Sequence, residues 1–203
     1  LTAEPLLGVP TDQWLQDVAV ADVDGDGRTD LLLALSRQGT QEGSVQVCLQ
    51  GAAGLACQAP VVVPVHNPCA LALLRRGMGG PVDVVLCGGE RDNAVSVLRN
   101  DGRGRFTIGP SYPVAAVPLD LAIADLDSDG VQDVVVLNYA ASGPSKISAL
   151  FGAADGTLSD AVTLGPVGEQ AQALAVADLD GDGRPDVAAV SVSERAVTML
   201  RSA

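Results

Sequence analysis

Twelve aspartates fall in three short loops of identical spacing, D-x-D-x-D-G-x-x-D, and their chemistry is that of an oxygen-ligated metal site. The loops contain Asp22, Asp24, Asp26 and Asp30, then Asp125, Asp127, Asp129 and Asp133, then Asp178, Asp180, Asp182 and Asp186. Four carboxylates so close together repel one another in a folded turn unless a cation neutralises them. Because every side-chain ligand is an oxygen, the pattern favours Ca²⁺ over zinc or copper.

Two further positions of each loop support a calcium cage. Position six is always a glycine, namely Gly27, Gly130 and Gly183. Glycine permits the sharp turn that gathers the acids around one centre. Position seven is expected to add a backbone carbonyl ligand, and the residues there are Arg28, Val131 and Arg184. Three Ca²⁺ sites are therefore predicted.

The loops allow two other interpretations. An EF-hand opens with similar acids, but it needs a glutamate at position twelve and a helix on either side. Position twelve is instead apolar, namely Leu33, Val136 and Ala189, inside strand-like runs. Alternatively, the aspartates only cap and solvate turns. Three copies in register favour metal binding over that alternative.

The loops belong to a repeated unit. "DVAVADVDGDGRTDLLLAL" recurs as "DLAIADLDSDGVQDVVVLN" and as "ALAVADLDGDGRPDVAAVS", with a weaker copy, "ALALLRRGMGGPVDVVLCG", between the first two. In the weaker copy Asp83 keeps the last loop position, while Arg75, Gly77 and Gly79 replace the three leading acids, so no metal is predicted there. The loops start at residues 22, 75, 125 and 178, a spacing typical of a four-stranded propeller blade.

Each unit is predicted to form four short strands, which in the first unit lie at about 18–21, 30–35, 44–49 and 55–60. The first strand alternates alanine with Val, Leu or Ile, as expected for a strand that is buried on both faces near the axis. The fold class predicted is all-β, a β-propeller with four blades of four antiparallel strands. One domain, 1–203, is expected, with repeats at about 15–66, 67–116, 117–169 and 170–203.

The ends of the chain suggest how the ring closes. The fourth unit stops after its third strand, Ala196–Leu200, while residues 1–10 resemble an outer strand. We expect the N-terminal segment to supply the missing strand, which would pair two exposed edges. Two alternatives stay open: a larger ring completed by a second copy, or a longer propeller of which this is a part. The protein is expected to be a monomer or a homodimer.

The motif "VADLDGDGRPD" followed by an apolar strand resembles the FG-GAP or VCBS repeats of integrin α-subunit propellers and bacterial surface proteins. The resemblance covers essentially the whole chain, including the Phe151–Gly152 pair. It implies a calcium-binding propeller whose metal loops join strands one and two of each blade. The second unit departs by lacking acids, and better-known relatives have seven blades. Integrin-like partner binding is therefore not carried over.

The chain has four cysteines, namely Cys48, Cys57, Cys69 and Cys87. A hairpin turning at residues 51–54 would place the first two across from each other. Antiparallel pairing of 70–74 with 83–87 would bring the other two together, in the unit that lacks calcium acids. We predict both disulfides. The alternative is four buried free thiols in a cytosolic protein.

Composition restricts the partners. A net charge of −13 without a basic cluster disfavours nucleic acid and anionic lipid. No apolar run approaches the length of a membrane span, so no membrane insertion is expected. His66 is the one histidine, and neither G-x-S-x-G nor a P-loop motif is present. We therefore expect a protein of the extracellular space or cell surface that is not an enzyme and binds a protein ligand. A lectin and the propeller domain of a lyase or hydrolase are the alternatives.

The ligand is expected on the face formed by the loops between strands two and three and between strands four and one. Aromatic and arginine side chains are favoured in such recognition surfaces. The main candidates there are Trp14, His66, Tyr112, Asn138 and Tyr139. Further candidates are Arg37, Asn67, Arg91, Asp92, Glu194 and Arg195. For each of them an ordinary surface or packing role is the alternative.

Overall fold

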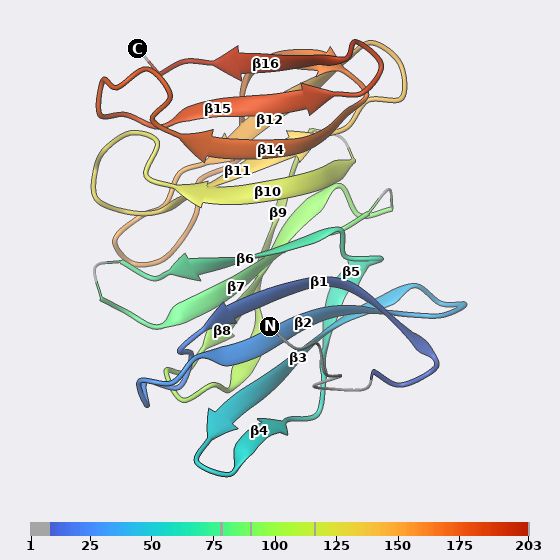
Figure 1. Ribbon diagram of the computed structural model, residues 1–203, viewed down its shortest axis with the longest axis vertical. Coiled ribbons are helices and arrows are strands. Elements are labelled where there is room, and N and C mark those ends of the chain that lie inside the picture. Colours follow the sequence, from blue (N-terminus) through green and yellow to red (C-terminus); the bar gives the residue numbers. More distant parts are fainter. Residues whose placement is uncertain (1–8, 78, 90, 116, 203) are drawn as a thin grey trace, which may run out of the picture.

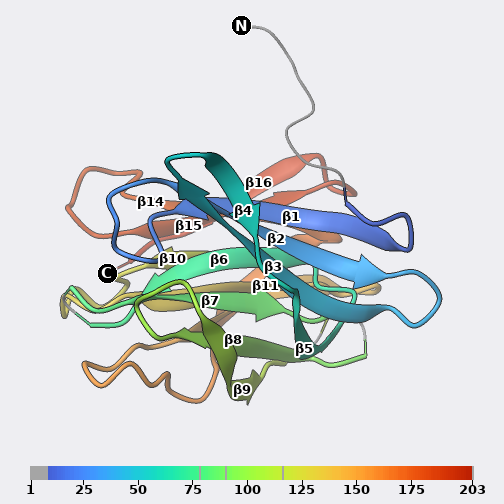
Figure 2. The ribbon, with the colours of Figure 1, turned by 90° about the horizontal axis from the view of Figure 1, so that it is seen from below.

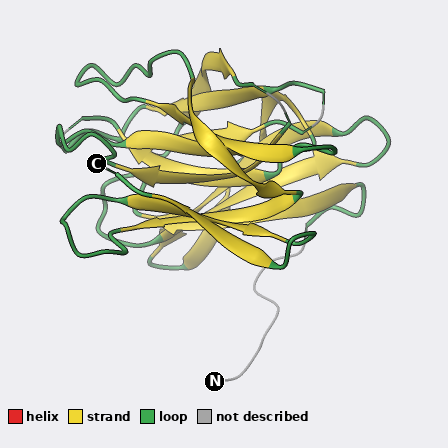
Figure 3. Cartoon of the chain, turned by 90° about the horizontal axis from the view of Figure 1, so that it is seen from above, coloured by secondary structure: helices red, strands yellow, loops and turns green. Residues whose placement is uncertain are grey.

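The computed structural model describes residues 9–77, 79–89, 91–115 and 117–202. All sixteen elements in this part of the chain are strands, which confirms the predicted all-β class (Figure 3). No helix among the described residues is long and apolar enough to cross a membrane.

The strands form four antiparallel sheets in chain order, which we call blades 1 to 4. Blade 1 contains β1 (Gln13–Ala21), β2 (Asp30–Arg37), β3 (Glu42–Gly51), β4 (Gly54–Cys57) and β5 (Val61–His66). Blade 2 contains β6 (Ala70–Arg75), β7 (Val82–Cys87), β8 (Ala94–Asn100) and β9 (Phe106–Pro113). Blade 3 contains β10 (Pro118–Ala124), β11 (Asp133–Asn138), β12 (Pro144–Leu150) and β13 (Val162–Glu169). Blade 4 contains β14 (Ala171–Ala177), β15 (Asp186–Ser191) and β16 (Ala196–Leu200).

The blades follow one another as in a four-blade propeller. The first strand of each blade packs on the first strand of the next, so that β1, β6, β10 and β14 stack in order (Figure 1). Seen from below, blade 1 is nearest to the viewer, and its strand β3 crosses in front of the other blades (Figure 2). No described strand of blade 4 pairs with a strand of blade 1. The predicted closing strand at residues 1–10 falls mostly outside the described residues, and residues 9 and 10 are in no strand.

The outer edge of blade 1 differs from the prediction of one strand at 55–60. It is split into β4, which pairs with the end of β3, and β5, which pairs with its beginning. The chain leaves the sheet between them at residues 58–60, where Pro60 has no N–H for a ladder hydrogen bond. Because β3 is ten residues long, both outer pieces find a partner on it.

The hydrophobic core lies between blades rather than within one. Each blade has a forward face, toward the next blade in the chain, and a backward face, toward the preceding one. Between blades 1 and 2, forward residues Leu32 and Ala34 pack with backward residues Val84 and Leu86. The same alternation repeats at the next two junctions. All six residues of β7 and all six of β11 are buried, since both faces of these strands are covered.

Two aspartates on the first strands connect neighbouring blades. Asp17 Oδ2 accepts a hydrogen bond from Leu71 N at 2.8 Å, and Asp120 Oδ2 accepts one from Leu174 N at 2.8 Å. Both lie at a register shift in their strand, which turns the side chain toward the next blade. Burial raises the pKa of Asp120, hydrogen bonds from the Leu174 and Leu121 amides oppose the shift, and the charge of Asp17 adds to it. The junction between blades 1 and 2 and the junction between blades 3 and 4 therefore each contain one such polar link.

Both predicted disulfides are present. Cys48 lies directly opposite Cys57 across β3 and β4, and the two are bonded. Cys69 is bonded to Cys87 at the end of β7, beside the Ala70–Cys87 pair of the ladder. None of the described cysteines has a free thiol. Blade 2, whose loop lacks the acids, thus has a covalent link between its first two strands.

Replacing Cys69 and Cys87 by alanine is expected to lower the free energy of unfolding by about 3 kcal/mol, because the bridge closes a loop of 18 residues in the unfolded chain. The same change at Cys48 and Cys57 should cost somewhat less, since that loop spans only 9 residues. Urea unfolding of the two variants measures both values. Equal stability of the Cys69/Cys87 variant and the unmodified chain would contradict the expectation.

Candidate metal centres and a candidate ligand pocket

The three acidic loops connect the first and second strands of blades 1, 3 and 4, as the family resemblance implied. The last aspartate of each loop is the first residue of the second strand and pairs with the residue just before the loop. These pairs are Ala21 with Asp30, Ala124 with Asp133, and Ala177 with Asp186. The sheet register therefore holds the two ends of every loop together (Figure 1).

The last aspartate is buried and accepts two backbone hydrogen bonds. Asp30 Oδ2 accepts from Val23 N at 2.9 Å, and its Oδ1 accepts from Gln50 N at 2.8 Å. Asp133 repeats this with Leu126 N and Gly152 N, both at 2.7 Å. Asp186 repeats it with Leu179 N at 3.1 Å and Ser202 N at 3.0 Å. This carboxylate thus joins its loop to the far end of the third strand.

The first aspartate shapes the turn. Asp22 Oδ1 accepts from Gly25 N at 2.7 Å, and Oδ2 accepts from Gly27 N at 2.9 Å. Asp178 makes the equivalent contacts with Gly181 and Gly183. Gly27 and Gly183 have φ values of 83° and 88°, in the left-handed region, where a side chain would be strained. The predicted role of the position-six glycine is therefore explained by the backbone.

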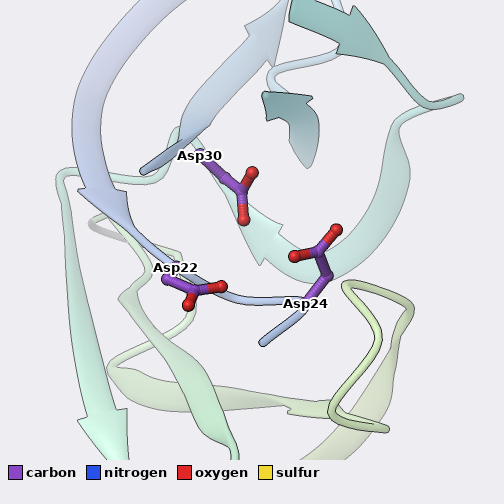
Figure 4. Close-up of side chains that lie close together, drawn as sticks. All are labelled: Asp22, Asp24 and Asp30. Carbon is purple, nitrogen blue, oxygen red and sulfur yellow. The ribbon is translucent and has the colours of Figure 1, made fainter. Parts of the chain in front are cut away.

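Three acids of each loop converge. The first, second and last aspartates each present one oxygen within 4.8 Å of the others. Figure 4 shows the three side chains of the first loop, Asp22, Asp24 and Asp30, lying close together. Calcium–oxygen distances of about 2.3–2.6 Å allow oxygens on opposite sides of one ion to be about 5 Å apart. The donor set and its spacing therefore fit a single Ca²⁺. The same grouping occurs in the second and third loops, at Asp125, Asp127 and Asp133 and at Asp178, Asp180 and Asp186.

The third aspartate of each loop does not belong to these groups. Asp26 Oδ1 accepts from Arg28 N at 2.8 Å, and its other oxygen pairs with the Arg28 guanidinium at 2.6 Å. Asp129 and Asp182 likewise accept the amide of position seven, from Val131 at 2.7 Å and Arg184 at 2.8 Å. A ligand role for these three acids, and for the position-seven carbonyls, stays a prediction.

The charge on the convergent acids needs compensation. Burial raises the pKa of Asp133, amide hydrogen bonds from Gly152 and Leu126 oppose the shift, and the charges of Asp127 and Asp125 raise it further. A bound divalent cation would favour the ionised form of all three carboxyls. Metal binding and ionisation are therefore coupled in this loop.

In blade 2 the last aspartate of the loop, Asp83, is contacted by the side chain of Arg76. Asp83 is equivalent to Asp30 and is fully buried, and it keeps the amide hydrogen bond from Asn100 N at 2.8 Å. Arg76 donates to both Asp83 oxygens, through Nε at 3.0 Å and through Nη2. Arg99 Nη1 lies 2.7 Å from Asp83 Oδ2. The hydrogen bonds from Arg76 to Asp83 raise the pKa of Arg76, which keeps its guanidinium charged. In blade 2 the positive charge beside the buried aspartate is therefore supplied by the Arg76 side chain.

A pocket of about 590 Å³ lies at the end of the blades opposite the acidic loops, on the side where the ligand face is predicted. We call it the axial pocket. Its lining includes the predicted residues His66, Asn67, Arg91 and Tyr139, together with Gln41, Cys69, Gly89, Val117, Pro118, Leu119 and Gln172. His66 Nδ1 lies 3.1 Å from Asp92 Oδ1, and Asp92 also accepts from the His66 amide. Residues of all four blades contribute, and the residue from blade 4 is Gln172 of β14.

Other predicted face residues lie elsewhere. Tyr112 packs between blades 2 and 3, where its hydroxyl accepts from Leu158 N at 3.1 Å. Asn138 is buried, and its side-chain amide donates to Ser148 Oγ at 2.9 Å. Trp14 is exposed but does not line the axial pocket. Tyr112 and Asn138 thus serve packing, which was the alternative given for every candidate.

Sequence reasoning missed Gln41 and Gln172 in the pocket and Arg76 at Asp83. Gln41 has a positive φ of 61°, which is uncommon outside glycine, and no sequence signal predicts it. Arg76 had one usable signal: a loop without acids contains an arginine close to the single remaining aspartate.

Comparison with known proteins gives the family. An FG-GAP-like repeat model matches residues 80–136 and 125–189, together more than half of the chain, and an FG-GAP repeat model matches residues 15–48. The chain belongs to the FG-GAP repeat family, as the resemblance implied. A search among curated proteins finds no match.

A solved structure shares the fold. It is a mutant of AofleA from Arthrobotrys oligospora, with a TM-score of 0.58 at 11% sequence identity. The likeness covers 95% of this chain but only 54% of that chain, so this chain spans about half of its length. At this identity the likeness shows the fold alone.

Proposed function

We propose that this chain is a non-catalytic, extracellular calcium-binding propeller module that binds a protein ligand at the axial pocket. The observation that carries the proposal is the separation of two sites. The three acidic loops lie at one end of the blades, and the axial pocket collects residues from every blade at the other. Calcium then stabilises the blades without contacting the ligand.

A structural role for calcium is supported by how each site is built. The carboxylate at the base of each loop already joins two strands through backbone hydrogen bonds. A cation beside it would neutralise the acids and link the loop to the same point. In blade 2 the Arg76 guanidinium neutralises the buried carboxylate of Asp83 in the same way. A guanidinium has no open coordination position for a substrate. The equivalence favours a stabilising role in all four blades.

The chemistry of the axial pocket supports binding rather than catalysis. His66 and Asp92 form a pair of the kind that activates a nucleophile. The described lining residues include no serine or threonine, and Cys69 is held in a disulfide. Tyr139 and Arg91 belong instead to the residue types that dominate recognition surfaces.

The extracellular assignment is supported by the two disulfides, which form and persist in oxidising compartments. Calcium sites of modest affinity, about 10⁻⁴ M, are also suited to the calcium concentration outside cells.

A glycan is the second candidate ligand. Three side-chain amides, Gln41, Asn67 and Gln172, line the axial pocket together with the ring of Tyr139. Amides are able to donate to and accept from sugar hydroxyls, and an aromatic ring packs against a sugar face. The pocket is also concave, whereas protein interfaces are commonly broad.

The proposal is tested by screening the calcium-loaded chain against a panel of extracellular proteins and a glycan array. Tyr139→Ala and Arg91→Ala are each expected to weaken binding about 10-fold or more, as truncation of such anchors does. Arg103→Ala, in the loop beside the calcium end of blade 1, is the matched control and should bind normally. Unchanged binding by the Tyr139/Arg91 double variant would contradict the site, and hits only among glycans would select the second candidate.

A further inference from the structure

Blade 2, whose loop lacks the leading acids, contacts an acidic loop on either side. On the side of blade 1, the side-chain amide of Asn100 donates to the Val23 carbonyl at 2.8 Å, and Gly104 N donates to the same carbonyl at 3.1 Å. Val23 lies between two of the converging acids, Asp22 and Asp24. The end of β8 and the turn that follows it are therefore fastened directly to the blade 1 loop.

On the side of blade 3, blade 2 contacts both the acidic loop and the segment that holds its last aspartate. Gln132, the residue before Asp133, accepts a hydrogen bond at Oε1 from Arg75 N at 2.7 Å. Arg99 Nη2 donates to the Gly156 carbonyl at 2.6 Å. Gly156 lies in the segment between β12 and β13, and an amide of the same segment donates to Asp133 Oδ1 at 2.7 Å. Blade 2 is thus connected to the base of the blade 3 loop.

The buried Asp83 carboxylate joins these two sides within blade 2. Its Oδ1 accepts from Asn100 N at 2.8 Å, and its Oδ2 lies 2.7 Å from Arg99 Nη1. Asn100 contacts blade 1 and Arg99 contacts blade 3, so neighbouring residues of β8 make both contacts. Asp83 and Asn100 are 0% and 3% exposed, and water therefore does not replace a partner that either of them loses. A shift at one contact is transmitted to the other.

The blade 4 loop has no such connection among the residues that the structure describes. Every hydrogen bond of residues 178–186 is made within blade 4 or to Ser202 just after it. Leu126 of the blade 3 loop packs against an apolar cluster that includes Val187 and Leu200 of blade 4. The pair of loops in blades 3 and 4 therefore serves as an internal comparison for the pair in blades 1 and 3.

We infer that blade 2 couples the two calcium sites beside it, so that calcium binds cooperatively to the loops of blades 1 and 3. The inference rests on the proposed calcium sites. Without an ion, repulsion among the converging carboxylates opens the blade 1 loop and withdraws the Val23 carbonyl from Asn100. With the loop closed around an ion, that carbonyl stays in place and orders Asn100 and, through Asp83 and Arg99, the segment that holds Asp133. Calcium binding at the second site then requires less ordering, and the effect is reciprocal.

Two variants, each with two intact sites, test the coupling by isothermal titration with calcium. Asp180→Asn disables the blade 4 site and leaves the sites of blades 1 and 3. We expect it to bind two ions with a Hill coefficient of about 1.4, which corresponds to a coupling of about 5-fold. Asp24→Asn leaves the sites of blades 3 and 4 and should bind two ions with a Hill coefficient of about 1, because those loops lack the connecting hydrogen bonds.

A variant of Arg99 tests the route through blade 2. Arg99→Met removes the contact with Gly156, while Arg76 still neutralises Asp83. Combined with Asp180→Asn, it should lower the Hill coefficient to about 1. Arg105→Met, in the turn between β8 and β9, is the matched control, because its guanidinium has no hydrogen bond among the described residues. It removes the same charge and should leave the cooperativity unchanged.

Amide hydrogen exchange gives a second readout that does not depend on the Arg99 variant. In the chain with both Asp24→Asn and Asp180→Asn, where the blade 3 site alone is intact, calcium should slow exchange of Gly104 N about 5-fold. Unchanged exchange, or two ions bound to the Asp180→Asn chain with a Hill coefficient of 1, would overturn the inference and leave the calcium sites in place. No calcium uptake by any of these chains would overturn the calcium sites as well.

Discussion

Removal of calcium is expected to lower the free energy of unfolding by about 4 kcal/mol, because three sites with dissociation constants of about 10⁻⁴ M each contribute about 1.4 kcal/mol at millimolar calcium. For a chain of 203 residues this corresponds to a fall in melting temperature of about 8 to 16 °C. Differential scanning calorimetry with excess calcium and then with EDTA measures it. The loss arises from carboxylates that stay close together after their counter-ion has gone.

Variants of the second aspartate of each loop provide the control. Asp24→Asn, Asp127→Asn and Asp180→Asn each remove one converging charge while keeping an acceptor for the loop amide. Each alone should cost about one third of the calcium effect. The triple variant in calcium should melt close to the EDTA-treated chain and respond little to EDTA. An EDTA melt of the unmodified chain that matches its calcium melt would contradict occupied sites.

Replacement of Arg76 by methionine is expected to cost about 3 to 5 kcal/mol, since it leaves the buried Asp83 carboxylate without its main partner. The lower end is favoured because Arg99 still lies 2.7 Å from Asp83. Chemical unfolding measures the loss, which should be the same in calcium and in EDTA. Blade 2 has no convergent acids among its described residues, so calcium does not replace the lost guanidinium.

Two further variants separate the charge effect from general damage to blade 2. Arg75→Met changes the neighbouring arginine and should cost less than about 0.5 kcal/mol, because among the described residues its guanidinium donates only to the Gly80 carbonyl, at 3.3 Å. Adding Asp83→Asn to Arg76→Met should recover part of the stability, because the neutral amide still accepts from Asn100 N without a buried charge. A double variant less stable than Arg76→Met alone would argue against an electrostatic cause.

The sequence by itself determined the features that repeat or that depend on neighbours within one blade. The spacing of the loops indicated four blades, and the alternation of apolar residues set the register that brings Asp30 beside Asp22 and Asp24. The two disulfides followed from the same local pairing. Such features are predictable because strand pairing with a period of two fixes which side chains meet across adjacent strands.

The tertiary structure decided what depends on contacts between distant parts of the chain. Arg76 reaches Asp83 alongside Arg99, which also contacts Gly156 of the next blade, and no local pattern encodes that reach. The axial pocket combines Gln41 with Gln172 from the two ends of the row of blades, while Tyr112 and Asn138 pack inside. The exposure of Val18 and Val197 depends on which blade has a neighbour, because equivalent apolar residues are buried wherever one is present.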